Sequence, residues 1–184
     1  DEAQQALLDF FSVAKDDPRR TRKGVYHAEV YGPPGKRVQV ILLDTRYFRS
    51  PIKKAPFDPK TRISACLPNT DPDATFLGAE QWKWLEEQLK KPAEVRLLAS
   101  SIQLVSDDHP FEKWANIPKE REKLHALLNS TKATGVIVLS GDRHLAEISL
   151  DTKSIGYPLY DVTSSGFNQG SKNWRAPEAI SKRL

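Results

Sequence analysis

The sequence contains no methionine and a single cysteine, Cys66. One cysteine cannot form an intramolecular disulfide, and no Cys or His stands near Cys66 at metal-ligand spacing, so we expect a structural or bystander thiol. Because methionine is absent, Asp1 is not a retained translation start. We therefore expect a processed product, an excised piece or an incomplete reading frame.

Long hydrophobic runs are also absent, since no stretch approaches the roughly 18 consecutive apolar residues of a membrane helix. We expect no membrane span, and no targeting signal is recognisable, so the segment leaves the compartment open. The net charge is only +4, and the one basic run occupies residues 19–23. We interpret this run as a solvated linker and expect no specific nucleic-acid binding.

What is present suits one soluble globular domain, because 39% of the 184 residues are hydrophobic and 28% are charged. The apolar spacing predicts an antiparallel hairpin, then helices alternating with strands, which is typical of an α/β fold. The predicted helices cover residues 3–14, 78–90 and 118–128. The predicted strands cover residues 24–31, 37–44, 95–100, 136–139, 145–150 and 159–162. Residues 46–75 lack periodicity and predict a long irregular excursion, a feature often retained for function.

The strongest chemical signal is Gly141-Asp142-Arg143-His144, where an apolar strand runs directly into a glycine turn. Open α/β sheets place their sites at such strand ends. Carboxylate oxygen and imidazole nitrogen are suitable metal ligands, and residues two apart can diverge toward two neighbouring ions. From these residues alone, a turn in which Asp142 is a structural cap is an equally good interpretation.

Several segments in order resemble the PhoD-like branch of the calcineurin-type metallophosphoesterases. The likeness runs from Leu7 to Phe167, and six separate matches in the right order are hard to obtain by chance. The six matching segments are residues 24–26 with 40–49, which include Leu43-Asp44-Thr45-Arg46, residues 77–85, residues 100–103, residues 112–114 with 118–121, Gly141-Asp142-Arg143-His144, and Thr163-Ser164-Ser165-Gly166.

The resemblance implies a partial metallophosphoesterase α/β/β/α sandwich, with a mixed sheet and flanking helices. Asp142 and His144 would be metal ligands, and Arg143 would lie beside the phosphate or point to solvent. The resemblance implies two or more metal ions in the intact enzyme, of which Fe, Ca, Zn or Mn are candidates. Family members are often exported, which suggests a periplasmic or secreted protein.

Further candidate residues lie at the ends of other strands and in one loop. Arg46 is a candidate substrate contact, although an ion pair with Asp44 that supports the site is the preferred interpretation. Ser100, Ser101 and Gln103 end a strand where related enzymes place a ligand or a polar group, so a supporting or substrate role suits them. His109 is a candidate for the cleft entrance, although a surface-loop histidine is the simpler interpretation.

The family's earlier motifs, which supply the remaining ligands, do not occur in this sequence. We therefore expect residues 1–184 to be the C-terminal part of one catalytic domain whose N-terminal, ligand-bearing half is absent. Such a segment alone should have little activity, because two protein ligands cannot hold a metal pair. Its inner sheet face would be bare, and we expect it to pair with the missing half or to self-associate.

The resulting prediction is metal-dependent hydrolysis of phosphate mono- or diesters by the intact enzyme. One alternative is a noncatalytic remnant or binding module that keeps the fold without the ions. A less favoured alternative is an esterase with Ser100 or Ser101 as its nucleophile. No Gly-x-Ser-x-Gly elbow surrounds either serine, and no base is identifiable by position.

Overall fold

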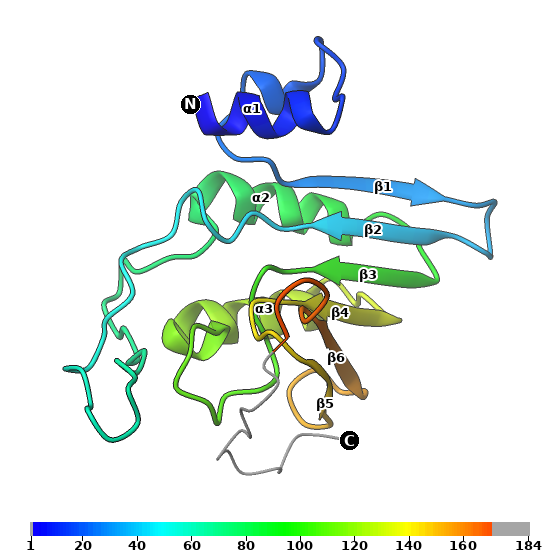
Figure 1. The fold of residues 1–184 in the computed structure, drawn as a ribbon. Helices are drawn as coiled ribbons and strands as arrows, with labels where there is room; N and C mark the ends of the chain where they lie inside the picture. Colours follow the sequence, from blue (N-terminus) through cyan, green and yellow to red (C-terminus); the bar gives the residue numbers. More distant parts are fainter. Residues whose placement is uncertain (1, 171–184) are drawn as a thin grey trace.

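A mixed six-stranded sheet organises residues 2–170, the part of the chain that the computed structural model describes (Figure 1). The strand order is β1-β2-β3-β4-β6-β5, in which β2, β3, β4 and β6 run parallel and β1 and β5 are antiparallel edges. The strands are β1 (His27–Tyr31), β2 (Val38–Leu42), β3 (Val95–Ala99), β4 (Val136–Ser140), β5 (Ala146–Asp151) and β6 (Leu159–Ser164). The predicted α/β class, with its hairpin and mixed sheet, is confirmed.

Two helices cover one face of this sheet, α2 (Gly78–Leu89) and α3 (Pro118–Ser130). α2 buries the predicted stripe of Trp82, Leu85 and Leu89, and α3 begins with a proline at its first turn. Glu120 joins the helices, because its buried carboxylate accepts a hydrogen bond from the Trp82 indole at 2.6 Å. Both helices belong to one core cluster with the sheet.

The helix-covered face has a closely packed apolar row across its centre. Ile41 lies opposite Leu98 in the register of β2 and β3, and Leu98 lies opposite Val138 in β4. All three side chains are fully or almost fully buried. Successive strand residues point to opposite sheet faces, so the residues between these three line the other face.

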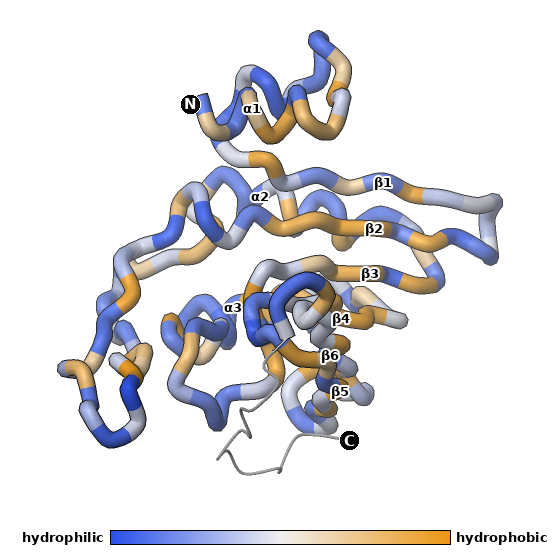
Figure 2. The backbone as a smooth tube through the Cα atoms, in the orientation of Figure 1, coloured by the Kyte–Doolittle hydropathy of each residue, from blue (hydrophilic) through white to orange (hydrophobic). Residues whose placement is uncertain are grey.

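That other face, here called the open face, is also apolar but partly exposed. The exposed fractions are 43% for Leu42, 37% for Leu139, 45% for Ile148 and 40% for Tyr160. Figure 2 shows hydrophobic residues concentrated along β2 and β3. The pairing register places one continuous apolar row across it: Leu42, Ala99, Leu139, Val162 and Ile148.

Two predicted element bounds are wrong by three or four residues, for local reasons, and the other predicted bounds agree with the structure within two residues. α1 (Glu2–Phe10) ends four residues before the predicted Ala14, because Ser12 adopts a left-handed φ of 53° and the Val13 N–H bonds back to Leu8. β1 begins at His27 and not at Gly24. The Gly24 N–H bonds instead to the side chain of Gln4, which ties α1 to the sheet beyond β1 (Figure 1).

The predicted excursion between β2 and α2 is irregular but tied down. Two isolated bridges, Lys54 with Cys66 and Asp58 with Ile63, fold its middle back on itself. The Cys66 N–H donates to the Pro110 carbonyl at 2.7 Å, which fastens the excursion to the loop after β3. The remaining short elements are the 3-10 helices η1 (Pro18–Arg20) and η2 (Trp114–Asn116). Among the described residues, no helix combines the length and apolar character needed to cross a membrane.

Candidate active site

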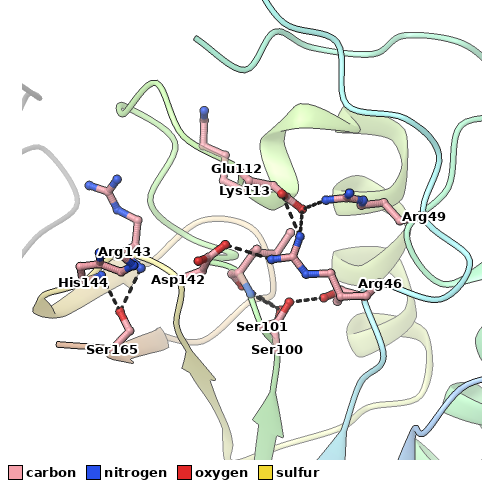
Figure 3. A network of polar contacts seen from close by, with 12 residues as sticks. Arg46, Arg49, Ser100, Ser101, Glu112, Lys113, Asp142, Arg143, His144 and Ser165 are labelled. Carbon is pink, nitrogen blue, oxygen red and sulfur yellow. Dashed lines mark hydrogen bonds and ion pairs between the residues drawn. The ribbon is translucent and has the colours of Figure 1, made fainter. Parts of the chain in front are cut away.

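The carboxyl ends of the four parallel strands meet at one edge of the sheet. Arg46 follows β2, Ser101 follows β3, Gly141-Asp142-Arg143-His144 follows β4 and Ser165 follows β6. Open α/β sheets place ligands at this edge, because side chains from neighbouring strand ends converge there. Residues from four separate parts of the sequence therefore meet in one region (Figure 3).

The turn after β4 has an unusual backbone. Asp142 and His144 both adopt left-handed φ angles, of 59° and 57°. Such angles are uncommon outside glycine, although Asp and His tolerate them better than most residues, and they are concentrated at functional sites. The two left-handed residues alternate with Arg143, so the turn needs stabilising contacts from elsewhere.

Ser165 supplies those contacts from the end of β6. Its hydroxyl oxygen accepts hydrogen bonds from the backbone N–H groups of Arg143 and His144, each at 2.9 Å (Figure 3). The neighbouring Gly166 allows close packing, because a Cβ there would lie 3.3 Å from the His144 carbonyl oxygen. The segment after β6 therefore holds the β4 turn in place.

Asp142, Arg143 and His144 line one wall of a cavity of about 670 Å³, here called the main cavity. Its other walls come from the excursion and from the loop that contains Phe111 and Glu112. The Asp142 side chain is 46% exposed, so its carboxylate is accessible from the cavity. The aspartate and the histidine thus line one shared space, with the Asp142 carboxylate turned toward Arg46 and His144 on the other side of the turn (Figure 3).

Arg46 connects this wall to a second carboxylate (Figure 3). Its guanidinium donates to Asp142 Oδ2 at 2.9 Å and to both oxygens of Glu112 at 2.9 Å. Arg49 donates to the same Glu112 at 2.5 Å. Glu112 is therefore held between two arginines, and one of them also reaches Asp142.

The preferred interpretation of Arg46, an ion pair with Asp44, is wrong. The Asp44 carboxylate accepts hydrogen bonds from the backbone N–H groups of Val25, Arg46 and Tyr47. These bonds fix the turn after β2 and leave the Arg46 side chain to extend toward Asp142. Asp44 is the nearer carboxylate along the sequence, whereas the fold brings Asp142 into contact with the Arg46 side chain.

Arg143 is buried, with only 4% of its surface exposed. Its guanidinium carbon lies 4.8 Å from the centroid of the Phe111 ring, a distance typical of a cation–π contact. Lys113 steadies the loop that carries this ring, because its ammonium donates to the carbonyls of His109 and Phe111. Burial lowers the pKa of Lys113. Arg143 is thus held at the cavity wall and does not point to solvent.

The polar residues after β3 are placed differently from one another. The Ser100 hydroxyl donates to the Ile102 carbonyl at 2.7 Å and accepts from the Trp114 indole at 3.0 Å. Gln103 is fully buried, and its amide donates to Thr163 and Glu147. Ser101 lines a cavity of about 580 Å³, which it shares with Arg46.

His109 and Cys66 complete the set of candidate side chains. His109 is only 4% exposed, and its Nδ1 accepts a hydrogen bond from the Phe111 N–H, so the surface-loop interpretation is wrong. Cys66 lines the main cavity, and burial raises the pKa of its thiol. A thiol with a raised pKa is a poor nucleophile and a poor metal ligand near neutral pH.

Sequence reasoning did not assign site roles to Arg49, Glu112 or Ser165. A signal existed for Ser165, because it follows a strand that ends at the same edge as β4. Glu112 lies in a loop without periodicity, and only the fold shows that it meets Arg46. Long-range partners of this kind carry no local sequence pattern.

The residues present suit part of a metal site. Asp142 and His144 offer oxygen and nitrogen donors on one cavity wall, and together they are a suitable pair of ligands. Among residues 2–170, however, no group of three or more His, Cys, Asp or Glu side chains could hold an ion. The turn therefore fits as a contributor of two ligands to a larger set.

Comparisons with known proteins give a consistent result. A family model described as PhoD-like phosphatase matches residues 1–164. A solved structure described as "Structure of PhoD" is similar, with a TM-score of 0.69 and 22% identity over 91% of this chain. At this identity the likeness shows the fold alone, and the match covers 34% of that solved chain. No curated protein matches the sequence.

Proposed function

Because the chain belongs to the PhoD-like phosphatase family, we propose that it forms part of a metal-dependent phosphoesterase and supplies one metal-binding turn to its active site. One observation carries the proposal: Asp142 and His144 lie on a strained turn and line one cavity together with Arg143. Strained non-glycine residues that face a cavity are more typical of a functional site than of a structural cap.

Metal ions bound at such a site activate water and stabilise the charge that develops on the phosphate. The residues of this chain would hold the metal ions and orient the phosphate ester. Asp142 and His144 each provide one ligand, and Ser165 fixes the backbone between them. Arg46 and Arg143 provide positive charge beside the ester oxygens. Glu112 orients the Arg46 guanidinium through a two-pronged contact.

We propose that further metal ligands come from protein segments outside this chain, with residues 1–184 acting as the C-terminal part of one catalytic domain. The match to about a third of a solved chain supports this division. The open face supports it too, because a continuous apolar row with residues such as Ile148 at 45% exposure favours a covering layer. That layer would be the remaining part of the domain or a second copy.

A hydrolysis assay tests the proposal. The protein in its native full length should release nitrophenol from 4-nitrophenyl phosphate or its bis-ester when supplied with Fe, Ca, Zn or Mn. The matched variant Asp142→Asn should lose this metal stimulation, because it keeps the side-chain shape but removes the negative charge. Equal activity in the presence of chelator would contradict metal dependence.

A noncatalytic remnant is the second candidate, and the contact between Arg46 and Asp142 favours it. An arginine that neutralises the carboxylate competes with a cation for the same oxygens. Calorimetry on the native full-length protein, which would carry the remaining ligands, separates the two candidates. Heat of divalent-metal binding that disappears in Asp142→Asn supports the phosphoesterase, whereas no heat in either protein supports the remnant.

The serine-esterase alternative gains no support from the contacts of its two candidate nucleophiles. Ser100 bonds to Ile102 and Trp114, and Ser101 shares a 2.5 Å hydrogen bond with the Thr45 hydroxyl. Within residues 2–170, neither serine hydroxyl bonds to a histidine or lysine that would act as its base. A periplasmic or secreted location stays a prediction.

A further inference from the structure

The main cavity is larger than its metal-facing wall requires. Its volume of about 670 Å³ falls within the roughly 300–1,000 Å³ range of pockets that hold whole organic ligands. Asp142 and His144 occupy only one wall. A phosphate group held beside them would leave most of the cavity for the organic part of an ester.

A second part of the cavity wall comes from the excursion, which is ordered by its own contacts. The bridge between Lys54 and Cys66 closes it, and Ala55 donates to the Ala65 carbonyl at 2.8 Å. Its attachment to the loop after β3 includes Asn116, whose side chain donates to the Cys66 carbonyl. The side chains of this wall therefore have a fixed backbone behind them.

At the tip of the excursion, the chain is shaped to present Arg62. Asp58 caps the tip, because its carboxylate accepts from the Lys60 N–H and the Thr61 hydroxyl, and these bonds lower its pKa. The Arg62 N–H then donates to the Asp58 carbonyl at 2.7 Å, with Arg62 at a left-handed φ of 57°. The tight tip places the Arg62 side chain on the cavity wall.

The charges of the cavity are unevenly distributed. Its two acidic side chains, Asp142 and Glu112, already accept ion-pair contacts from Arg46, and Glu112 accepts one from Arg49 as well. Lys54 and Arg62 line the cavity from the excursion and form no ion pair with any residue between 2 and 170. The excursion wall therefore keeps its positive charge for a ligand.

From this arrangement we infer that the main cavity takes the organic part of the phosphate ester, and that Lys54 and Arg62 bind a second anionic group on it. The apolar side chains of Ile63 and Phe111 line the same cavity and suit the carbon framework between the two charges. The inference rests on the proposed phosphoesterase function and adds the substrate class: phosphate esters whose alcohol carries its own negative charge.

A pair of matched substrates tests the inference in the native full-length protein loaded with metal. 4-Carboxyphenyl phosphate carries the second charge, and 4-carbamoylphenyl phosphate is its neutral counterpart of nearly equal shape. We expect kcat/KM for phosphate release to favour the charged ester about fivefold, as two partly exposed ion pairs allow. The preference should fall as salt is added, because salt screens exposed charges.

Variants of the excursion identify the residues responsible. The double variant Lys54→Gln with Arg62→Gln should reduce the preference to about one, and Arg62→Glu should reverse it. Lys60→Gln is the matched control, since Lys60 is an exposed cation on the same tip but lies outside the cavity lining. The control should keep the preference of the unchanged protein.

The outcomes separate this inference from the proposed function. If neither ester is hydrolysed, the phosphoesterase proposal fails and the inference fails with it. If both are hydrolysed at equal kcat/KM, or if the double variant keeps the preference, the inference alone is overturned. A preference that disappears only when Lys54 and Arg62 are replaced supports it.

Discussion

The ends of β3 and β4 lie side by side at the same sheet edge, yet their polar residues have different fates. After β3, Ser100 and Gln103 are buried and bonded to partners inside the fold. After β4, Asp142 and His144 line a cavity on a left-handed backbone. Both ends are candidate sites in the sequence, because each is an apolar strand followed by polar residues, although the turn after β4 carries the stronger signal.

The difference teaches that a polar strand end becomes a binding site only when its side chains are left available to a ligand. Burial without a partner is costly, so a buried polar group such as the Gln103 amide must bond internally. The turn after β4 differs from this case. Its backbone is stabilised by Ser165, and the side chains of Asp142 and His144 remain exposed. The following four predictions test this contrast, from the largest expected effect to the smallest.

Removing Asp161, which bonds to the segment after β3, should give the largest loss in the free energy of unfolding. Its buried carboxylate accepts from the Leu104 and Val105 N–H groups and from the Ser140 hydroxyl. Asp161→Ala leaves these donors without their acceptor, so we expect a loss of about 3 kcal/mol in the free energy of unfolding, measured by urea denaturation. Asp73→Ala, at an exposed position, is the control and should change it by less than about 0.5 kcal/mol.

Asp142→Asn, in the turn after β4, should change metal binding strongly and the free energy of unfolding only slightly. Asparagine tolerates the left-handed backbone, so the free energy of unfolding should change by less than about 0.5 kcal/mol. Loss of the carboxylate charge should weaken divalent-metal binding about a hundredfold, as measured by titration calorimetry on the native full-length protein. A large stability loss with unchanged metal affinity would make Asp142 a structural cap.

Ser165→Ala should lower both stability and metal affinity, because Ser165 holds the backbone of the turn after β4. Loss of its two accepted hydrogen bonds should lower the free energy of unfolding by about 1 kcal/mol. Metal affinity should fall about tenfold, as is typical of residues that orient ligands. Ser165→Thr keeps the hydroxyl and should restore affinity. If affinity stays unchanged in Ser165→Ala, the positioning role is refuted.

The pH dependence of stability should give the smallest effect. Burial raises the pKa of Asp161 in the folded state, although three donated hydrogen bonds oppose this shift. A raised folded pKa means that the folded protein binds the Asp161 proton more tightly than the unfolded chain does. The stabilisation that this proton gives is complete below the unfolded pKa, and it is lost as pH rises through the folded pKa. Urea titrations at several pH values should show this trend, and Asp161→Asn should lack it.

Much of the fold was predictable because its signals are local. The stripe of Trp82, Leu85 and Leu89 predicted α2, and the apolar runs predicted the strands. The errors came from single residues with special backbone or side-chain bonds. Ser12 ends α1 early through its left-handed φ, and Gln4 withdraws Gly24 from the β1 ladder.

The candidate site was predictable only where its residues adjoin one another. Asp142 and His144 stood out because they follow a strand and a glycine turn. The pairing of Arg46 with Asp142 spans 96 positions and has no local pattern, whereas the nearer Asp44 was a misleading partner. The cations of the excursion, Lys54 and Arg62, also lacked any periodicity that would place them at the cavity.

The sequence by itself determined the strands, most of the helices and the glycine turn after β4, because hydrophobic periodicity and turn chemistry act over a few residues. Only the tertiary structure decided which polar side chains remain available. That choice placed Gln103 inside the fold and left Asp142 in the main cavity. The physical reason is that a polar group bonds to whichever partner the packed elements bring nearest, and packing joins residues that the sequence keeps far apart.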